Sequence, residues 1–566
     1  MRSFSSMMIA LTMLAAASFA PADTYPRQPG VDVQQYVFRL TLRDDTDKIE
    51  GVTTVDLVFV AAGVTELLLD LIGTRGDDTT GMTVTGVWIA GALAAGPATS
   101  ARLPVADRGT QAPFEHAGDR LRIQLATPSK IGQRAFITVA YHGTPAAALR
   151  IGPNTHGDRT FFSDNWPNKA RNWLPIIDHP YDKATSQMVV IAPAHYQVVS
   201  NGLRIEDPDR PDGSRLTHWK QSVPIAPWLY VIGAARFAVH QDGQLHGVPI
   251  QTWVYPQDSD TGFATFPATT FEALEFFSET IGPFAYEKLA SIQSASVGGG
   301  MEAASAIFYG EESATGARPD RWRNVIVHEI AHQWFGNSVT EADWDDVWLS
   351  EGFATYFTLL YREHANGRDD FVAGLRQARE RIFAFYDTQP DYRIVHDNLD
   401  DMSKVTTGMQ YQKGAWTLHM LRGIVGTETF WRAIRTYYRT YRDANASSAD
   451  FRRVMEETSG MELGWFFDQW LRQGGVPEIA ARWRYDADAA VVRLQLSQVQ
   501  PGSARFRLLL TVRLQLADGS SLDTRVDLGP SGTAISISAE QPPISVQIDP
   551  DTWVLARTHL EQEERP

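Results

Sequence analysis

Three side chains that can ligate a metal lie close together in the middle of the chain, with a further carboxylate beside them. His328 and His332 are four positions apart, so on a helix they project from one face, within reach of one ion. Glu351 offers a third ligand and leaves a fourth position open, as is typical of catalytic zinc. Glu329 lies next to the histidine face, where a carboxylate can take a proton from the attacking water. The pattern predicts a zinc hydrolase that binds one ion.

Each half of this motif is expected on a helix. Residues 322–327 lead into the histidines, with Asp320 as the expected N-cap and Gly336 at the end. A second helical pattern begins near residue 345 or 346 and carries Glu351. Its apolar side chains recur at helical spacing, at Phe353, Tyr356, Phe357 and Leu360. Two helices are therefore predicted to bring the ligands together.

The spacing resembles that of the M1 family of zinc aminopeptidases, within the gluzincins. The H-E-x-x-H motif, the eighteen residues after His332 and an E-G-F-A context at Glu351 all match that family. In family order, residues 299–302 resemble its G-x-M-E-N motif and residues 411–414 its Y-x-K-G segment. The resemblance covers most of the chain after residue 22. It implies a thermolysin-like catalytic domain that removes N-terminal residues from peptide substrates.

The resemblance implies that Gly299, Gly300, Met301 and Glu302 bind the substrate. A carboxylate near the metal can hold the free N-terminal ammonium through a charge-assisted hydrogen bond, and Glu302 is the candidate. Glycine lets a substrate backbone approach closely, because it has no side chain. Glycine runs are also common in turns, so a glycine-rich turn followed by an edge strand stays open as the structural alternative.

The resemblance also implies a catalytic role for Tyr411. A phenol there can stabilise the oxyanion that forms when water adds to the scissile carbonyl. Tyrosines on helices are more often core packing, so this role depends on the resemblance alone. Lys413 and Gly414 are compatible with setting helix geometry only.

Near the expected site, the sequence differs from the family pattern, and four positions are concerned. Ala303 replaces the asparagine of G-x-M-E-N, which removes one polar contact beside Glu302. Trp166 stands where the family has a side chain for the substrate amine, and Asp164 is either a substitute for it or a turn residue. Thr358 replaces an acidic residue behind the ligands, where a hydroxyl orients a ligand more weakly. A zinc hydrolase of another specificity, an endopeptidase or epoxide hydrolase, and a non-catalytic metal-binding protein therefore stay open.

Composition favours a large acidic protein. The formal charge is −16 from 51 basic and 67 acidic side chains, which argues against nucleic acid and anionic membranes as partners. The chain contains no cysteine, so disulfides and thiolate ligands are excluded. Nothing in the sequence indicates an oligomeric state.

The first 22 residues resemble a secretory signal. A positive start at Arg2, an apolar core over residues 7–17 and a small-x-small site at residues 20–22 give the three expected parts. The apolar core is too short to span a membrane, and no later stretch reaches about 20 apolar residues. We therefore expect cleavage after residue 22 and a periplasmic or secreted protein.

Three regions are expected after the signal, which gives a multidomain α+β fold. Alternating apolar residues over 23–243 predict an all-β domain, and helical patterns over 244–473 predict the catalytic domain. Alternation returns over 474–566 and predicts a C-terminal β-sandwich that ends near Trp553. Without the large helical domain that many family members add after it, the active site is expected to be open on that side.

Overall fold

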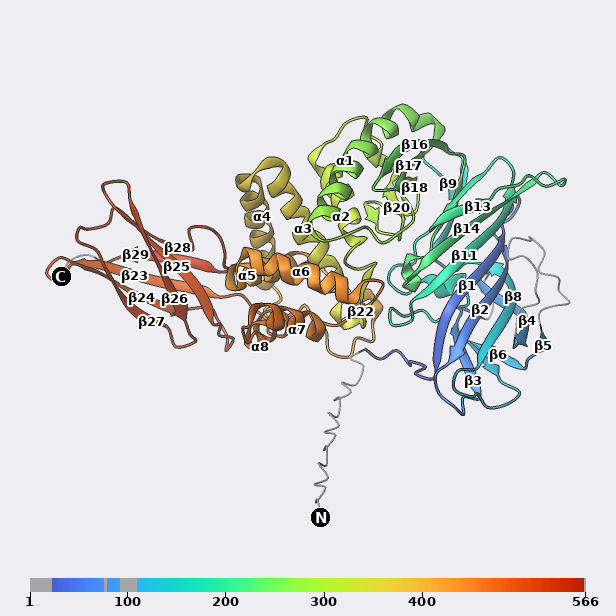
Figure 1. Ribbon diagram of the computed structural model, residues 1–566, viewed down its shortest axis with the longest axis horizontal. Coiled ribbons are helices and arrows are strands. Elements are labelled where there is room, and N and C mark those ends of the chain that lie inside the picture. The colour runs from blue at the N-terminus through green and yellow to red at the C-terminus, as the bar shows by residue number, and fades with distance from the viewer. Residues whose placement is uncertain (1–22, 76–78, 92–108, 564–566) are drawn as a thin grey trace, which may run out of the picture.

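A computed structural model describes residues 23–75, 79–91 and 109–563 (Figure 1). The described chain passes through a β domain, a mainly helical region and a second set of β-sheets, in that order. This arrangement confirms the predicted multidomain fold. The expected signal segment, residues 1–22, lies outside the described residues.

The described residues of the N-terminal β domain form three sheets. Eight strands form the largest, in the order β13-β14-β11-β1-β2-β8-β4-β5, in which β1 pairs parallel with β11 and antiparallel with β2. Smaller sheets have the orders β12-β15-β10-β9 and β3-β7-β6. The strands are β1 (Val31–Thr41), β2 (Ile49–Phe59), β3 (Glu66–Asp70), β4 (Gly81–Ala90), β5 (Thr110–Gln111), β6 (Phe114–Ala117), β7 (Arg120–Gln124), β8 (Arg134–Thr144), β9 (Leu149–Pro153), β10 (Arg159–Ser163), β11 (Ala184–Pro193), β12 (Gln197–Ser200), β13 (Leu203–Glu206), β14 (Ser214–Ile225) and β15 (Ile232–Ala235).

The central region combines helices with a five-stranded sheet of order β16-β17-β18-β20-β19. Its strands are β16 (Ala238–Leu245), β17 (Val248–Val254), β18 (Leu289–Ser294), β19 (Gly300–Met301) and β20 (Ala306–Gly310), with a separate pair β21 (Val339–Glu341) and β22 (Ala444–Ala446). Its helices are α1 (Ser259–Thr280), α2 (Asp320–His332), α3 (Trp348–Asn366), α4 (Arg368–Tyr386), α5 (Gly408–Val425), α6 (Thr427–Tyr441), α7 (Ser448–Ser459) and α8 (Gly464–Arg472). The boundary expected at 243/244 falls inside β16, whose sheet belongs to this region.

Helices α2 and α3 carry the two halves of the motif, with ends that differ from the sequence expectation. Helix α2 begins at Asp320 itself, with Pro319 as its N-cap, because proline fits the extended backbone that precedes a helix. It ends at His332, four residues before Gly336. Helix α3 begins at Trp348, after a short 3-10 turn over Trp344–Asp346. The carboxylates near 345 therefore lie in the turn before the helix.

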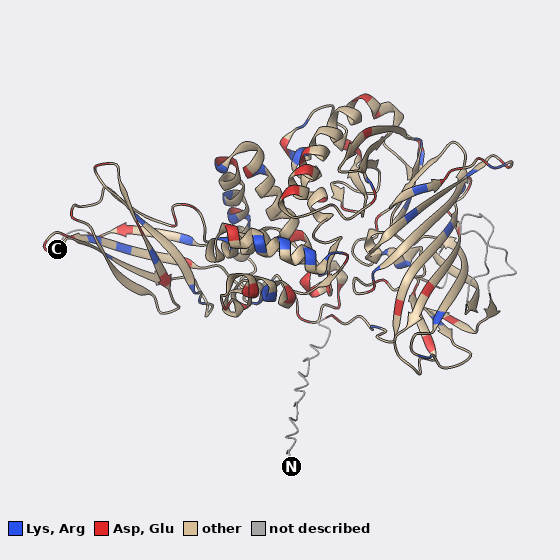
Figure 2. Cartoon of the chain, in the orientation of Figure 1, with Lys and Arg blue, Asp and Glu red and all other residues tan. Residues whose placement is uncertain are grey.

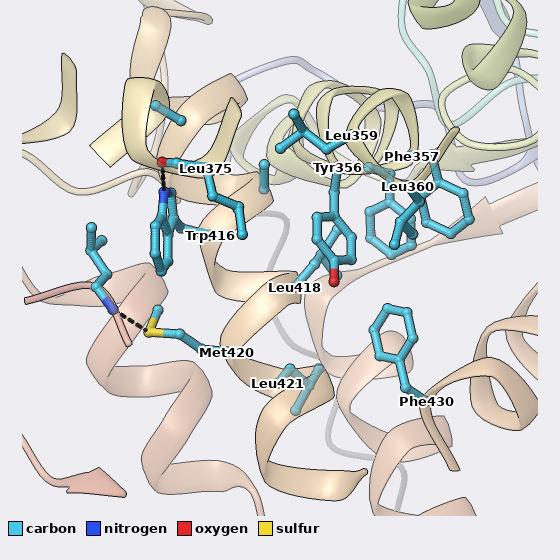
Figure 3. Close-up of a cluster of buried hydrophobic side chains, with 14 of the residues drawn as sticks. Tyr356, Phe357, Leu359, Leu360, Leu375, Trp416, Leu418, Met420, Leu421 and Phe430 are labelled. Atoms are coloured by element: carbon cyan, nitrogen blue, oxygen red, sulfur yellow. Dashed lines mark hydrogen bonds between the residues drawn. The ribbon is translucent and has the colours of Figure 1, made fainter. Parts of the chain in front are cut away.

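Helices α3 and α5 cross at two glycines. A Cβ added to Gly352 would lie 2.9 Å from the Cα of Gly414, so neither position has room for a side chain. Around this crossing, aromatic and aliphatic side chains of α3, α4, α5 and α6 form a buried cluster (Figure 3). Within it, the indole N–H of Trp416 donates to the carbonyl of Leu375 at 3.0 Å and fastens α5 to α4. The core thus fixes the angle between the helices that bear the site.

The C-terminal region consists of two sheets, of orders β27-β24-β23-β29 and β26-β25-β28. Its strands are β23 (Glu478–Asp486), β24 (Val491–Gln498), β25 (Leu508–Gln515), β26 (Ser521–Leu528), β27 (Thr533–Ser538), β28 (Ser545–Ile548) and β29 (Arg557–Gln562). The expectation that the region ends near Trp553 is wrong, because β29 follows and pairs parallel with β23. This edge strand is mostly exposed, so it lacks the apolar alternation that reveals other strands.

Side chains of the β domain hold the loop that follows α2. The ammonium of Lys183 donates to the carbonyls of Asn337 and Ser338, at 3.0 and 2.8 Å. Arg27 forms an ion pair of 2.8 Å with Asp343. The β domain and the helical region are therefore joined directly behind the histidine motif. Among the described residues, no helix is long and apolar enough to cross a membrane.

Candidate metal centre and substrate cavity

The structure brings His328, His332 and Glu351 to one point between α2 and α3. Their ligand atoms all lie within 4.8 Å of one another. The Oε2 of Glu351 is 3.4 Å from Nε2 of His328 and 3.3 Å from Nε2 of His332. This buried oxygen has no hydrogen-bond partner among the described residues. Two imidazole nitrogens and an orphaned carboxylate oxygen facing one another fit a zinc ion, for which they supply three of four tetrahedral ligands.

The charges around this point also favour a cation. Burial opposes the charged form of His332, but the carboxylates of Glu302 and Glu351 raise its pKa well above the usual range. Burial raises the pKa of Glu329, and the charges of Glu302 and Glu351 raise it further. Three carboxylates thus share a pocket with two imidazoles. A divalent cation would offset this excess of negative charge.

Groups behind His332 fix its ring. Its Nδ1 lies 3.2 Å from the carbonyl oxygen of Phe335 and 3.1 Å from the hydroxyl of Ser350. A hydrogen bond at Nδ1 leaves Nε2 as the nitrogen that faces the ion. Gly336 makes this geometry possible: its φ is +108°, and a Cβ there would lie 2.2 Å from the Ser350 hydroxyl. The turn that ends the motif is therefore shaped around its second ligand.

Gly300 gives Glu329 its space. A Cβ built on Gly300 would lie 2.3 Å from Oε1 of Glu329, whereas Gly298 and Gly299 have open space around theirs. Gly300 and Met301 form β19, the edge strand that pairs with β20. The glycine-rich turn followed by an edge strand, left open as a structural alternative, is thus present, and it borders the candidate metal centre. Gly300 accommodates the Glu329 carboxylate itself.

Glu302 follows β19 and is buried, with 6% of its surface exposed. The amides of Gln333 and Asn337 donate to its carbonyl oxygen at 2.9 and 2.6 Å. These two side chains fix the backbone at Glu302, although Ala303 lacks the polar group of the family motif. Gln333 directly follows His332, and both amides stand in an otherwise apolar turn. Two amide side chains in an apolar turn indicate a local hydrogen-bonding role, which the spacing of the zinc motif does not reveal.

Tyr411 lies at the first turn of α5, opposite the histidines. Its phenol donates to Oε1 of Glu351 at 2.7 Å, and its ring stacks on His328 with centroids 5.9 Å apart. The crossing of Gly414 against Gly352 holds it there. Lys413 points away and donates to the hydroxyl of Tyr386 and the carbonyl of Gln473. Lys413 and Gly414 thus help to position α5, which agrees with the interpretation that they set only the geometry of the helix.

The three departures in other elements have distinct surroundings. Trp166 packs edge-on against Trp228 and Trp344, as core aromatic residues do. Asp164 accepts the backbone N–H of Trp166, as a turn residue does, and its charge also raises the pKa of Glu302. The hydroxyl of Thr358 donates to the carbonyl of Ala354 in its own helix. The ligand-orienting contact considered for Thr358 is therefore supplied by Ser350 instead.

A cavity of about 430 Å³ opens beside the three candidate ligands. It extends from Glu302 and Gly300 along α2 and α3 to one face of α4. Helices bearing two histidines and a glutamate, with a carboxylate beside them and a cavity in front, form the kind of centre found in metallohydrolases.

Comparison with known families places this centre in a wider context. The model described as "Peptidase family M1 domain" matches residues 268–470, and "Peptidase M1 N-terminal domain" matches residues 102–229. Together the two models match more than half of the 566 residues. The chain therefore belongs to peptidase family M1.

Curated relatives agree with this assignment. Glutamyl aminopeptidase of Homo sapiens is 30% identical over 335 residues, which are 56% of this chain and 34% of the relative. Probable aminopeptidase 2 of Sulfurisphaera tokodaii is 28% identical over 328 residues, 55% of this chain and 41% of the relative. The matched part thus spans about a third to two fifths of these relatives.

Solved structures share the fold. The M1 zinc metallopeptidase from Deinococcus radiodurans aligns with a TM-score of 0.64 and 23% identity, over 78% of this chain and 93% of that one. Aminopeptidase A of Legionella pneumophila, solved in complex with aspartic acid, aligns with a TM-score of 0.78 and 18% identity. That alignment covers 96% of this chain and 61% of the Legionella chain.

Proposed function

We propose that this protein is a zinc-dependent aminopeptidase that hydrolyses the N-terminal peptide bond of peptides. The observation that carries the proposal is the buried carboxylate of Glu302 beside the His328, His332 and Glu351 set. A free ammonium placed there would gain a charge-assisted hydrogen bond. Burial raises the pKa of Glu302, and a substrate ammonium beside this carboxylate would favour its charged form. An endopeptidase has no need of a carboxylate placed to hold a free substrate ammonium.

Each candidate residue has a defined part in this reaction. His328, His332 and Glu351 would hold zinc, which when bound supplies a Lewis acid for the scissile carbonyl. Glu329 takes a proton from the attacking water and passes it to the leaving amine. Glu302 holds the substrate ammonium, with the backbone of Gly299, Gly300 and Met301 alongside the peptide. The Tyr411 phenol donates to Glu351 in this structure, and during the reaction it would turn its one O–H to the developing oxyanion instead.

Hydrolysis of aminoacyl-arylamides beside their N-acetylated counterparts tests the proposal. An aminopeptidase cleaves only the free-amine set, and a zinc chelator abolishes that cleavage. Glu302→Gln should raise KM for the free-amine substrates, because the ammonium loses its partner. Glu312→Gln, an exposed glutamate outside the cavity, is the matched control. Equal cleavage of acetylated substrates would reject the aminopeptidase assignment and favour an endopeptidase.

We further propose that the protein is exported, as a periplasmic or secreted enzyme. The support is the three-part pattern of residues 1–22, which lie outside the described residues. Mass analysis of protein made in an exporting bacterial host should find Asp23 at the N-terminus. Protein that stays in the cytoplasm with residues 1–22 attached would reject the proposed export.

A further inference from the structure

The cavity continues past the metal ligands, to a wall that the candidate reaction does not use. On α3 it is bordered by Thr355, Thr358, Leu359 and Arg362, which share one helix face. On α4 it is bordered by Gly374, Gln377, Ala378 and Arg381, again at the spacing of one face. Gln412, next to Tyr411, completes this end. The α4 wall is defined here as Gln377 and Arg381.

The two arginines of this end differ in their partners. Arg362 forms an ion pair with Asp370, at 2.6 Å between Nη2 and Oδ1, and a second hydrogen bond of 3.0 Å. Arg381 is exposed and has no ion pair or hydrogen bond among the described residues. Figure 2 shows several blue Lys or Arg positions along α4. Arg381 is thus an uncompensated cation at the border of the cavity.

The α4 wall lies on the side away from Glu302. The segment that carries Glu302 lies against the β domain, because the carbonyl of Ala304 accepts a hydrogen bond from the Asn201 side chain, whereas α4 lies beyond α3 from that domain (Figure 1). Helix α4 turns back along α3 after Gly367, since Asp370 contacts Arg362 and a Cβ on Gly374 would meet Leu359. Seven residues beyond Gly374, Arg381 lies about 10 Å further along α4. It therefore lies back toward the end of α3 that carries Glu351.

The cavity is thus acidic at one end and basic at the other. A peptide with its ammonium at Glu302 must direct its leaving part away from the β domain, toward α4. We propose that Arg381, assisted by the amide of Gln377, binds the C-terminal carboxylate of short peptides and so selects free peptides over longer or blocked chains. This assignment rests on the proposed aminopeptidase activity. Asn324 also borders the cavity, and its buried side-chain carbonyl oxygen has no hydrogen-bond partner among the described residues.

Four substrates that share one N-terminal residue X show whether Arg381 binds the C-terminal carboxylate of the peptide or the carboxylate of an acidic side chain. They are the X-arylamide, X-Gly-Gly as the free acid, X-Gly-Gly-amide and X-Glu-Gly-amide. We expect the free acid to exceed the amide in kcat/KM by about tenfold, the strength of one charge-assisted contact. A preference confined to X-Glu-Gly-amide would assign Arg381 to an acidic side chain and overturn the C-terminal assignment.

Variants of Arg381 give the decisive comparison. Arg381→Ala should raise KM for the free acid about tenfold, with kcat and arylamide cleavage unchanged, and Arg381→Lys should restore part of the preference. Arg381→Glu should favour the amide. Arg376→Ala is the matched control, because this exposed arginine is on the same helix and does not border the cavity. An acid-to-amide ratio that is the same in wild type and Arg381→Ala would reject the inference.

Binding measurements keep this outcome separate from failure of the proposed activity. Titration calorimetry on the zinc-loaded Glu329→Gln variant compares X-Gly-Gly with its amide without turnover. Cleavage of arylamides with no acid preference would leave the aminopeptidase assignment intact and reject only the role of Arg381. Absence of all cleavage, together with tighter binding of the free acid, would reject the proposed reaction and retain Arg381 as a carboxylate-binding residue. Equal binding of acid and amide would reject the inference in either case.

Discussion

The two ends of the cavity are built in opposite ways. At the metal end the candidate residues are buried or half-buried and contact one another: Tyr411 donates to Glu351, and Ser350 and Phe335 hold His332. At the α4 end, Gln377 and Arg381 are exposed, and the described chain gives Arg381 no partner. The first end is preorganised for chemistry, since its groups cannot move apart. The second is open to whatever ligand offers charge, which suits the recognition of variable substrates.

Removing a ligand should have the largest effect at the metal end. His332→Ala takes away one of three protein ligands and leaves Glu351 with a single imidazole, so we expect loss of zinc and of all turnover. Metal analysis after dialysis measures the zinc content. His364→Ala, an exposed histidine near the end of α3, should keep a full equivalent. A fully loaded His332→Ala protein would show that the ligand set is wrong.

Replacing the proposed base should separate metal binding from catalysis. We expect Glu329→Gln to retain zinc but to lose about 10³-fold in kcat, because the amide cannot accept the proton. Steady-state kinetics and metal content on the same preparation provide the measurement. Glu380→Gln, an exposed glutamate on α4, serves as control. Turnover within tenfold of wild type in Glu329→Gln would remove this residue from the mechanism.

Adding one methyl group should have different effects at Gly300, which contacts Glu329, and at Gly298, which has open space around it. Gly300→Ala would place a methyl 2.3 Å from Glu329, so the carboxylate must shift, and we expect a loss of about 100-fold in kcat. Gly298→Ala, two residues away with nothing within 4 Å of its Cβ, should change kcat by less than about threefold. Similar losses in both variants would mean that the glycines act on the substrate backbone and not on Glu329.

The helix crossing under the metal end should respond in stability. Gly352→Ala adds a methyl 2.9 Å from the Cα of Gly414, and overpacking of this kind costs about 1–3 kcal/mol. Urea unfolding monitored through tryptophan fluorescence gives the change in the midpoint. Gly408→Ala, at the first residue of α5 and without close neighbours, is the control. An unchanged midpoint in Gly352→Ala would show that the two helices can separate at little cost.

The smallest effect is expected for the paired arginine of the α4 end. Arg362 is already neutralised by Asp370, so Arg362→Ala should alter the acid-to-amide ratio by less than about twofold. The same four substrates used for Arg381 measure this ratio. A larger change for Arg362 than for Arg381 would reverse the assignment of the carboxylate site and weaken the contrast between the two arginines.

The sequence predicted the metal end far better than the α4 end, for a physical reason. His328, Glu329 and His332 lie on one helix, where spacing alone sets their geometry. Glu351 was predicted as the third ligand of the zinc pattern, and Glu302 and Tyr411 were selected through family resemblance; the structure brings all three to the same cavity. The roles of these site residues remain predictions. Arg381 had no signal, because its place at the cavity depends on how α4 folds back over α3.

The fold shows the same division. Long alternating and helical segments predicted the order of the three regions correctly. Strand β29 was missed because it is an exposed edge strand, and its sequence therefore lacks the alternation of apolar and polar residues that predicts strands. The hydrogen bonds from the side-chain amides of Gln333 and Asn337 to the Glu302 carbonyl were also missed. These residues are 31 and 35 positions away from Glu302 in the chain. The two amides stand out locally in an apolar turn, but the partner that they bind follows only from tertiary packing.

Lys183 links the β domain to the substrate end of the cavity through one intermediary. Its ammonium donates to the carbonyl of Asn337, and the Asn337 amide donates to the carbonyl of Glu302. The helical region therefore does not support the site by itself. A fragment that contained the helical region alone would lose this support, so the segment that carries Glu302 depends on the β domain for its geometry.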